Sequence, residues 1–171
     1  RLPERDFVGD PVKYSFSGVI PIDDVYKALV KWCRLYKYDI IEKEHKTAAM
    51  TDSKSHVFNW TLVKKTTDYV KYMIDVEIKV LGLKEVKTKE ARKKYYQGSL
   101  QFLFSAYLFK DYEDMYGKNP IVKFMRESYD KFVTENKMRG FEKELMMERD
   151  KLISEIKSFL SLQKLTEKEE K

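Results

Sequence analysis

The sequence is poor in the residues that build disulfides, thiolate metal sites and phosphate-binding loops. Cys33 is the only cysteine among 171 residues, so one chain can form neither an internal disulfide nor a thiolate zinc site. The two histidines, His45 and His56, lack helical metal-ligand spacing, and no glycine-rich phosphate loop, G-x-S-x-G or CxxC motif is present. The common catalytic signatures and cofactor motifs are therefore excluded, and the lone cysteine favours a reducing, cytoplasmic setting.

Long apolar runs and structure breakers are also scarce. The longest apolar run, residues 100–109, contains Gln101 and Ser105 and is about half the length of a membrane-spanning helix, so no span is expected. Six glycines and four prolines argue against long structureless linkers. The charge of +6 comes from 34 basic and 28 acidic residues, largely interspersed, which favours solubility over one strongly basic surface.

The clearest pattern is an alternation of apolar and polar residues over 69–83. A period of two puts successive side chains on opposite faces of a strand, so this stretch predicts a long strand with one dry face. A shift of one residue would expose that whole face, so the register is strongly specified. The predicted dry face consists of Val70, Tyr72, Ile74, Val76, Ile78 and Val80.

Similar patterns predict the remaining elements. The first helix, from Ile22 to about Lys37, begins with Asp23 and Asp24, which favour the positive end of the helix dipole. The strands before and after this helix are predicted from the alternation of apolar and polar residues and from the turn residues between them. We expect a polar arm over 1–11, a strand over 12–20 with a bulge at Gly18, an edge strand over 38–50, a strand through 58–62, a break at Gly82, a short strand over 84–89, and a last long strand over 98–109.

The C-terminal third predicts helix. Asn119 can cap its start and Pro120 suits the first helical position. Gly140 either separates two helices or kinks one long helix, and Arg149 interrupts the apolar stripe of the second part. The expected organisation is therefore an α+β domain over 12–135, a C-terminal helix over 136–165 and a charged tail over 166–171.

The predicted fold is α+β: a curved antiparallel sheet of about five or six strands, with one early helix and one or two long C-terminal helices packed on it. This element order resembles the helix-grip fold of the START-like superfamily over residues 12–135, although one early helix stands where that family usually has two. The resemblance implies a small apolar ligand held between the sheet and the helix that begins at Pro120.

A second resemblance rests on short motifs spread over nearly the whole chain. They are similar to those of a group of small uncharacterised archaeal proteins of about this length, which implies an archaeal single-domain protein and no particular activity. The motifs are Trp32, Tyr38-Asp39 with Glu42, Trp60, Thr67-Asp68-Tyr69, Lys110-Asp111-Tyr112-Glu113, Tyr129-Asp130-Lys131, and Ile156-Lys157 before Phe159-Leu160.

Excess apolar surface is the strongest functional signal. On the last strand, Leu103, Tyr107 and Phe109 fall on the face opposite Phe102 and Phe104, and one layer of helices covers only one face of a sheet. The leading prediction is a non-enzymatic protein that self-associates or binds a protein partner. Its predicted interface comprises Leu103, Tyr107, Phe109, Leu152, Ile156 and Phe159.

A basic stretch offers an alternative function. Six cations precede Tyr95 and Tyr96, and cations with stacking aromatics are the minimal requirements for contact with nucleic acid. The competing interpretation is a solubilising hairpin tip. The cations are Lys84, Lys87, Lys89, Arg92, Lys93 and Lys94.

The remaining candidates have simpler structural interpretations. Asp111 and Asp114 could share one helical face and bind a hard cation such as Mg²⁺, or form part of a solvated connector. Cys33 lies on the apolar side of the first helix and is interpreted as a small core residue. The two histidines are interpreted as solvated or structural residues. No catalytic residue and no cofactor is predicted.

Overall fold

The computed structural model describes residues 4–50, 53–67, 70–86, 95–110 and 120–169, with side chains except at 4, 43–50, 53–55, 83, 120–136 and 163–169. Six strands and two helices account for most of this length. They are β1 (Glu4–Phe7), β2 (Val12–Ile20), α1 (Ile22–Tyr36), β3 (Asp39–Met50), β4 (Ser53–Lys65), β5 (Val70–Val86), β6 (Tyr95–Lys110) and α2 (Pro120–Glu169).

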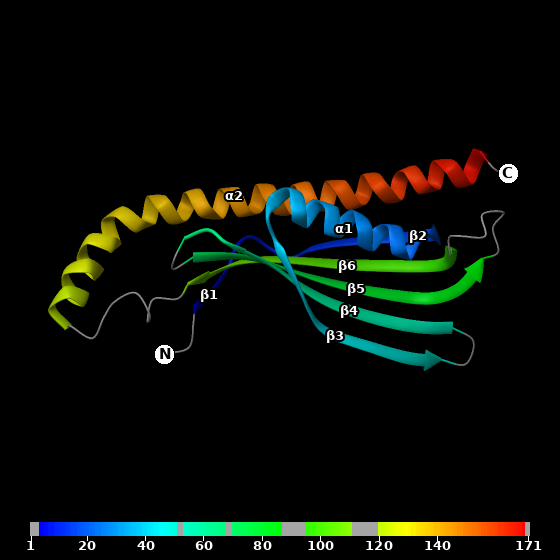
Figure 1. Cartoon of the computed structure of the whole chain (residues 1–171), viewed down its shortest axis with the longest axis horizontal. Helices are drawn as coiled ribbons and strands as arrows, with labels where there is room; N and C mark the ends of the chain where they lie inside the picture. The colour runs from blue at the N-terminus through cyan, green and yellow to red at the C-terminus, as the bar shows by residue number, and fades with distance from the viewer. Residues whose placement is uncertain (1–3, 51–52, 68–69, 87–94, 111–119, 170–171) are drawn as a thin grey trace.

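The strands form one antiparallel sheet in the order β1-β6-β5-β4-β3, and β2 also pairs with β6. β1 lies along the C-terminal half of β6 and β2 along its N-terminal half, so the first and last strands are neighbours. Both helices cover the same face of the sheet, with α2 running along its length (Figure 1). The predicted α+β class and the edge position of β3 are confirmed.

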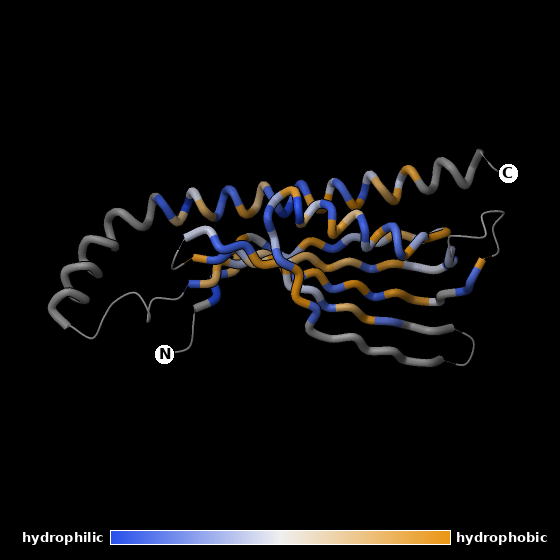
Figure 2. Tube along the Cα trace, in the orientation of Figure 1, coloured by the Kyte–Doolittle hydropathy of each residue, from blue (hydrophilic) through white to orange (hydrophobic). Residues whose placement is uncertain are grey.

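The alternation predicted for 69–83 is present in β5. Its even-numbered residues from Val70 to Val80 are at most 5% exposed, whereas Lys71 and Lys79 are exposed. The buried set faces the helices, and β4 and β6 contribute matching residues such as Leu62 and Phe104. Figure 2 shows hydrophobic and hydrophilic residues intermixed along these strands. The core therefore lies between one face of the sheet and the two helices.

The first helix forms where its pattern predicts. Val25, Leu29, Trp32 and Cys33 are buried against the sheet, and Asp23 and Asp24 occupy the acidic first turn. Lys37 adopts a left-handed conformation (φ 63°) that ends the helix and turns the chain into β3. Within the described residues, no helix is long and apolar enough to cross a membrane.

Three local predictions differ from the structure, and one open alternative is decided by it. The arm expected over 1–11 contains β1, and the register of β2 against β6 passes Gly18 without the predicted bulge. β5 does not end at Gly82: this glycine (φ 65°) lies at a register shift, and the strand continues to Val86. α2 passes Gly140 unbroken, so the single long helix is the correct alternative and residue 136 lies inside it. The three strand predictions failed for one reason. β1, β2 and β5 take their form from pairing with β6, which is distant in the sequence, and a local residue pattern carries no information about that pairing.

Candidate functional site

A pocket of about 430 Å³ lies between the first turns of α1 and the helix-covered face of the sheet. Helical spacing turns Ile22 and Val25 toward the sheet, and the even-numbered residues of β4 and β5 face them. We call this space the α1 pocket. Its lining residues are Ile20, Ile22, Asp23, Val25, Tyr26, Lys27, Glu42, Phe58, Trp60, Ile78, Val80 and Leu100.

Three aromatic side chains form one wall of the α1 pocket. The rings of Tyr26 and Trp60 meet edge-on, with centroids 5.4 Å apart, and the ring of Phe58 is 5.8 Å from that of Trp60. Trp60 is only 8% exposed, whereas Tyr26 is 47% exposed. The wall therefore runs from the buried interior of the pocket to its open side.

Charged side chains are confined to the open side of the pocket. Asp23 and Lys27 come from α1 and Glu42 comes from β3, where it pairs with Trp60 across the ladder. All three are exposed. The pocket thus combines an apolar interior with a charged rim, an arrangement that can bind and orient a small molecule.

The space between α2 and the sheet contrasts with this pocket. Leu145, Leu152, Ile156 and Leu160 of α2 are at most 3% exposed and belong to the core. The α1 pocket therefore differs in place from the ligand site predicted between the sheet and the helix beginning at Pro120. Because the side chains of residues 120–136 lie outside the described residues, that site stays a prediction.

A buried polar network joins α2 to the sheet. Lys64 donates to Glu148 (Nζ to Oε1, 2.8 Å), and the Tyr38 hydroxyl donates to the other carboxylate oxygen. The ammonium of Lys64 also lies 5.4 Å and 5.9 Å from the ring centroids of Tyr38 and Tyr72. Glu148 is 5% exposed, and its charge is balanced by the lysine and the hydroxyl.

Burial and neighbouring carboxylates raise the pKa of two tyrosines in this network. For Tyr38 burial is the larger cause, followed by its hydrogen bond to Glu148. For Tyr72 burial again leads, followed by its hydrogen bond to Glu144 (3.0 Å). Both hydroxyls therefore remain protonated donors at neutral pH. Sequence reasoning missed this network because its members come from β4, β5, α2 and the short connection between α1 and β3.

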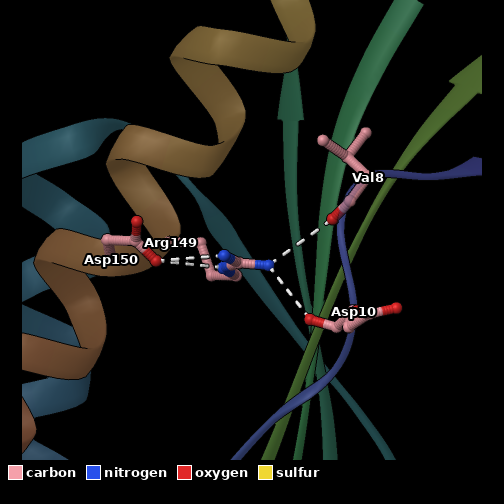
Figure 3. A network of polar contacts seen from close by, with 4 residues as sticks. All are labelled: Val8, Asp10, Arg149 and Asp150. Atoms are coloured by element: carbon pink, nitrogen blue, oxygen red, sulfur yellow. Dashed lines mark hydrogen bonds and ion pairs between the residues drawn. The ribbon is translucent and has the colours of Figure 1, made fainter.

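Arg149 explains the interruption of the apolar stripe in α2. It is 5% exposed, and its Nη1 donates to the carbonyl oxygens of Val8 and Asp10, each at 3.4 Å. Its guanidinium also pairs with Asp150 at 3.1 Å (Figure 3). A Cβ at Gly9 (φ 68°) would lie 3.3 Å from this guanidinium. Arg149 thus fastens α2 to the segment that joins β1 to β2.

The predicted interface residues separate into two groups. Tyr107, Leu152 and Ile156 are at most 3% exposed within the single chain, so their assignment to an open interface is wrong. Tyr107 is covered by Phe7, whose ring centroid lies 5.5 Å away, and α2 buries the other two in the core. Leu103, Phe109 and Phe159 are half-buried, and Phe159 packs against the core.

The helix-free face of the sheet carries a second, polar groove of about 380 Å³. There the Thr61 hydroxyl donates to Asp75 at 2.7 Å. The nearby Tyr107 hydroxyl is buried and has no hydrogen bond of ordinary geometry among the described residues; burial, followed by the charge of Asp75, raises its pKa. Asn59, Glu77, Leu103 and Ser105 also line this groove.

Most candidates for the alternative functions lie outside the described residues. Lys84 is exposed near the end of β5 and Tyr95 is half-buried at the start of β6. The rest of the basic stretch (Lys87, Lys89, Arg92, Lys93 and Lys94) and the acidic pair Asp111 and Asp114 lie outside the described residues. The described residues contain no group of three or more side chains that could hold a metal ion.

The histidines and the cysteine show no catalytic grouping in the described structure. His56 is half-buried, with its ring centroid 6.1 Å from that of Phe58, and the side chain of His45 lies outside the described residues. Cys33 is 2% exposed, and burial raises the pKa of its thiol to about 12. A thiol in that state is not a nucleophile at neutral pH.

Comparisons with known proteins place this chain in no family. No family model matches the sequence, and no curated protein matches it. One solved structure, a delta-endotoxin, superposes on 71% of this chain with a TM-score of 0.39 and 10% sequence identity. The superposition spans 65% of the length of that toxin.

Proposed function

We propose that this protein binds a small, mainly apolar molecule in the α1 pocket. The observation that carries the proposal is the pocket itself: about 430 Å³ of space lined mainly by aliphatic and aromatic side chains beside the core. Its size falls within the range of about 300–1,000 Å³ typical of small-molecule sites. The function that fits is reversible binding and carriage, because the interior of the pocket is apolar and its charged lining residues, Asp23, Lys27 and Glu42, are exposed at the rim.

The energetics of the core support this proposal. Empty apolar space forfeits packing contacts and lowers stability. A ligand that covers the exposed parts of Phe58, Ile22 and Tyr26 gains roughly 25 cal/mol for each Å² of apolar surface removed from water. Binding would therefore stabilise the folded chain and couple α1 more firmly to the sheet.

The strand order supports the resemblance to the START-like helix-grip fold. The first long strand, β2, pairs with the last strand, β6, and β5, β4 and β3 then follow to the edge in reverse chain order. α2 packs along the same face as α1 (Figure 1). The proposal takes from this resemblance only the class of ligand, because the pocket lies under the early helix. With its single buried cysteine, the protein is proposed to work in the cytoplasm.

The test is titration calorimetry with decanol, a neutral molecule with an apolar chain. Ile22→Phe adds volume inside the α1 pocket and should weaken decanol binding at least about tenfold through overpacking. Leu35→Phe is the matched control, because Leu35 is 72% exposed on the same helix and is not a lining residue. Equal binding by both variants, or no binding by the unmodified protein, would contradict the proposal.

Self-association remains a second candidate function, carried by the helix-free face of the sheet. Phe7 is 67% exposed there, and Leu103 and Phe109 are half-buried. A dimer would have a light-scattering mass near twice 20.5 kDa. Phe109→Asp should return that mass to the monomer value without unfolding the chain, and a monomeric unmodified protein at micromolar concentration would reject this candidate.

A further inference from the structure

The α1 pocket has a charged rim that indicates what kind of apolar molecule it takes. We propose that the ligand is an organic cation, with an apolar body inside the pocket and an ammonium group beside Asp23 and Glu42 at the open side. This inference rests on the proposed function and adds the chemical class of the ligand to it.

The two carboxylates are available for such a group. Asp23 and Glu42 are exposed lining residues, and among the described residues neither has a hydrogen bond or an ion pair. Carboxylates elsewhere in the chain are used differently: Glu148 pairs with Lys64, and Asp6 pairs with Lys110. Both rim carboxylates therefore keep acceptor oxygens that a bound ligand can contact.

The aromatic wall favours the same charge. The face of an aromatic ring carries partial negative charge, and tryptophan attracts cations most strongly of the three aromatic side chains. Trp60 pairs with Glu42 across the β3–β4 ladder, and Tyr26 contacts Trp60 at 5.4 Å. A cation at the rim would thus lie near both a carboxylate and an aromatic surface.

The chain itself uses this kind of contact. The ammonium of Lys64 lies 5.4 Å from the centroid of the Tyr38 ring and also pairs with the carboxylate of Glu148. Lys157 lies 5.2 Å from the centroid of the Tyr14 ring. At the α1 pocket the carboxylate and the ring are present, and a ligand would supply the cation.

Two features oppose a cation at the rim. The first is Lys27, a lining residue with one positive charge. The second is the N-terminus of α1, which has no side-chain cap and carries roughly half a positive charge from the helix dipole. Against the two carboxylates this leaves about half a negative charge. The lysine side chain is exposed and flexible, so it can move its charge into water. The expected preference for a cation over a neutral ligand is therefore moderate, and an anion should bind least well.

The test compares three ligands that share one decyl chain: decyltrimethylammonium, decanol and decanoate. In titration calorimetry we expect the cation to bind about tenfold more tightly than decanol, and decanoate to bind most weakly. Added salt should reduce the preference for the cation, because the rim is exposed and screening weakens its field.

Variants of the rim separate charge from shape. Asp23→Asn combined with Glu42→Gln should lower the affinity for the cation to about that for decanol while leaving decanol binding unchanged. Asp39→Asn together with Asp10→Asn is the matched control, because both residues are exposed and neither lines the pocket. Lys27→Gln should raise the affinity for the cation.

The outcomes distinguish this inference from the proposed function. If decanol or decanoate binds at least as tightly as the cation, or if the rim variant keeps the full preference, the inference is wrong and the apolar site stands. If none of the three ligands binds, the proposed function fails with it. A preference for the cation that only the rim variant removes supports both.

Discussion

The buried contact between Tyr38 and Glu148 predicts a specific loss of stability in Tyr38→Phe. The substitution keeps the ring, which stacks on Trp32 with centroids 5.2 Å apart, and removes only the hydroxyl that donates to Glu148. A hydrogen bond to a charged group contributes about 1.5–3 kcal/mol. Since Glu148 retains Lys64 at 2.8 Å, we expect a loss near the lower end, about 2 kcal/mol at pH 7.

The same variant should change the alkaline stability of the protein. Burial and Glu148 raise the pKa of Tyr38 above its ordinary value of 10.0. Below this value both the folded and the unfolded chain keep the tyrosine proton, so its contribution to stability is complete. Above it the unfolded chain releases a proton that the folded chain retains, and stability falls by about 1.4 kcal/mol per pH unit for each such group. Above about pH 10, the free energy of unfolding of Tyr38→Phe should therefore fall less steeply with pH than that of the unmodified protein.

Urea unfolding followed by circular dichroism between about pH 8 and about pH 11 measures both quantities. The matched control is Tyr36→Phe, because Tyr36 also stacks on Trp32, at 4.7 Å, and is half-buried outside the Glu148 network. Equal losses in the two variants at pH 7, or identical alkaline slopes in Tyr38→Phe and the unmodified protein, would refute this account of the network.

Three further predictions follow from buried groups. Arg149→Met keeps most of the apolar stem but removes the donors to Val8 and Asp10; we expect a loss of about 2–3 kcal/mol in urea unfolding, and an unchanged midpoint would contradict it. In this variant, backbone amide hydrogen exchange should become faster in β1 than in β5. An equal increase in both strands would argue against an anchor at the segment that joins β1 to β2. Iodoacetamide should leave Cys33 unmodified in the folded protein, since its thiol is 2% exposed and burial raises its pKa to about 12; rapid alkylation without unfolding would show that α1 packs differently.

The sequence predicts those strands and helices whose own residue pattern shows which side is buried. β5 alternates over its whole length because one face is buried, and α1 shows a helical stripe because it packs on one side. β1 left little signal, because four residues gain their strand conformation only by pairing with the distant end of β6. Arg149 looked like an interruption for the same reason, since its acceptors lie about 140 positions earlier in the chain.

The place of the α1 pocket was not predictable from the sequence. An apolar ligand site was expected between the sheet and the helix beginning at Pro120; farther along that helix, Leu145, Leu152 and Ile156 are buried in the core. The α1 pocket joins residues from α1 and five strands, and none of its members stands out in its own segment. Its rim could have been suspected only from knowledge that Glu42 lies opposite Trp60.

The central claim is that a small apolar molecule occupies the α1 pocket, and the emission of Trp60 reports on it most directly. Trp32→Phe leaves Trp60 as the only tryptophan and removes an indole N–H that has no partner among the described residues. In this variant, saturating decanol should shift the Trp60 emission maximum and raise the thermal midpoint together. An unchanged spectrum at saturating decanol, or the same decanol affinity after Ile22→Phe is added, would contradict the claim.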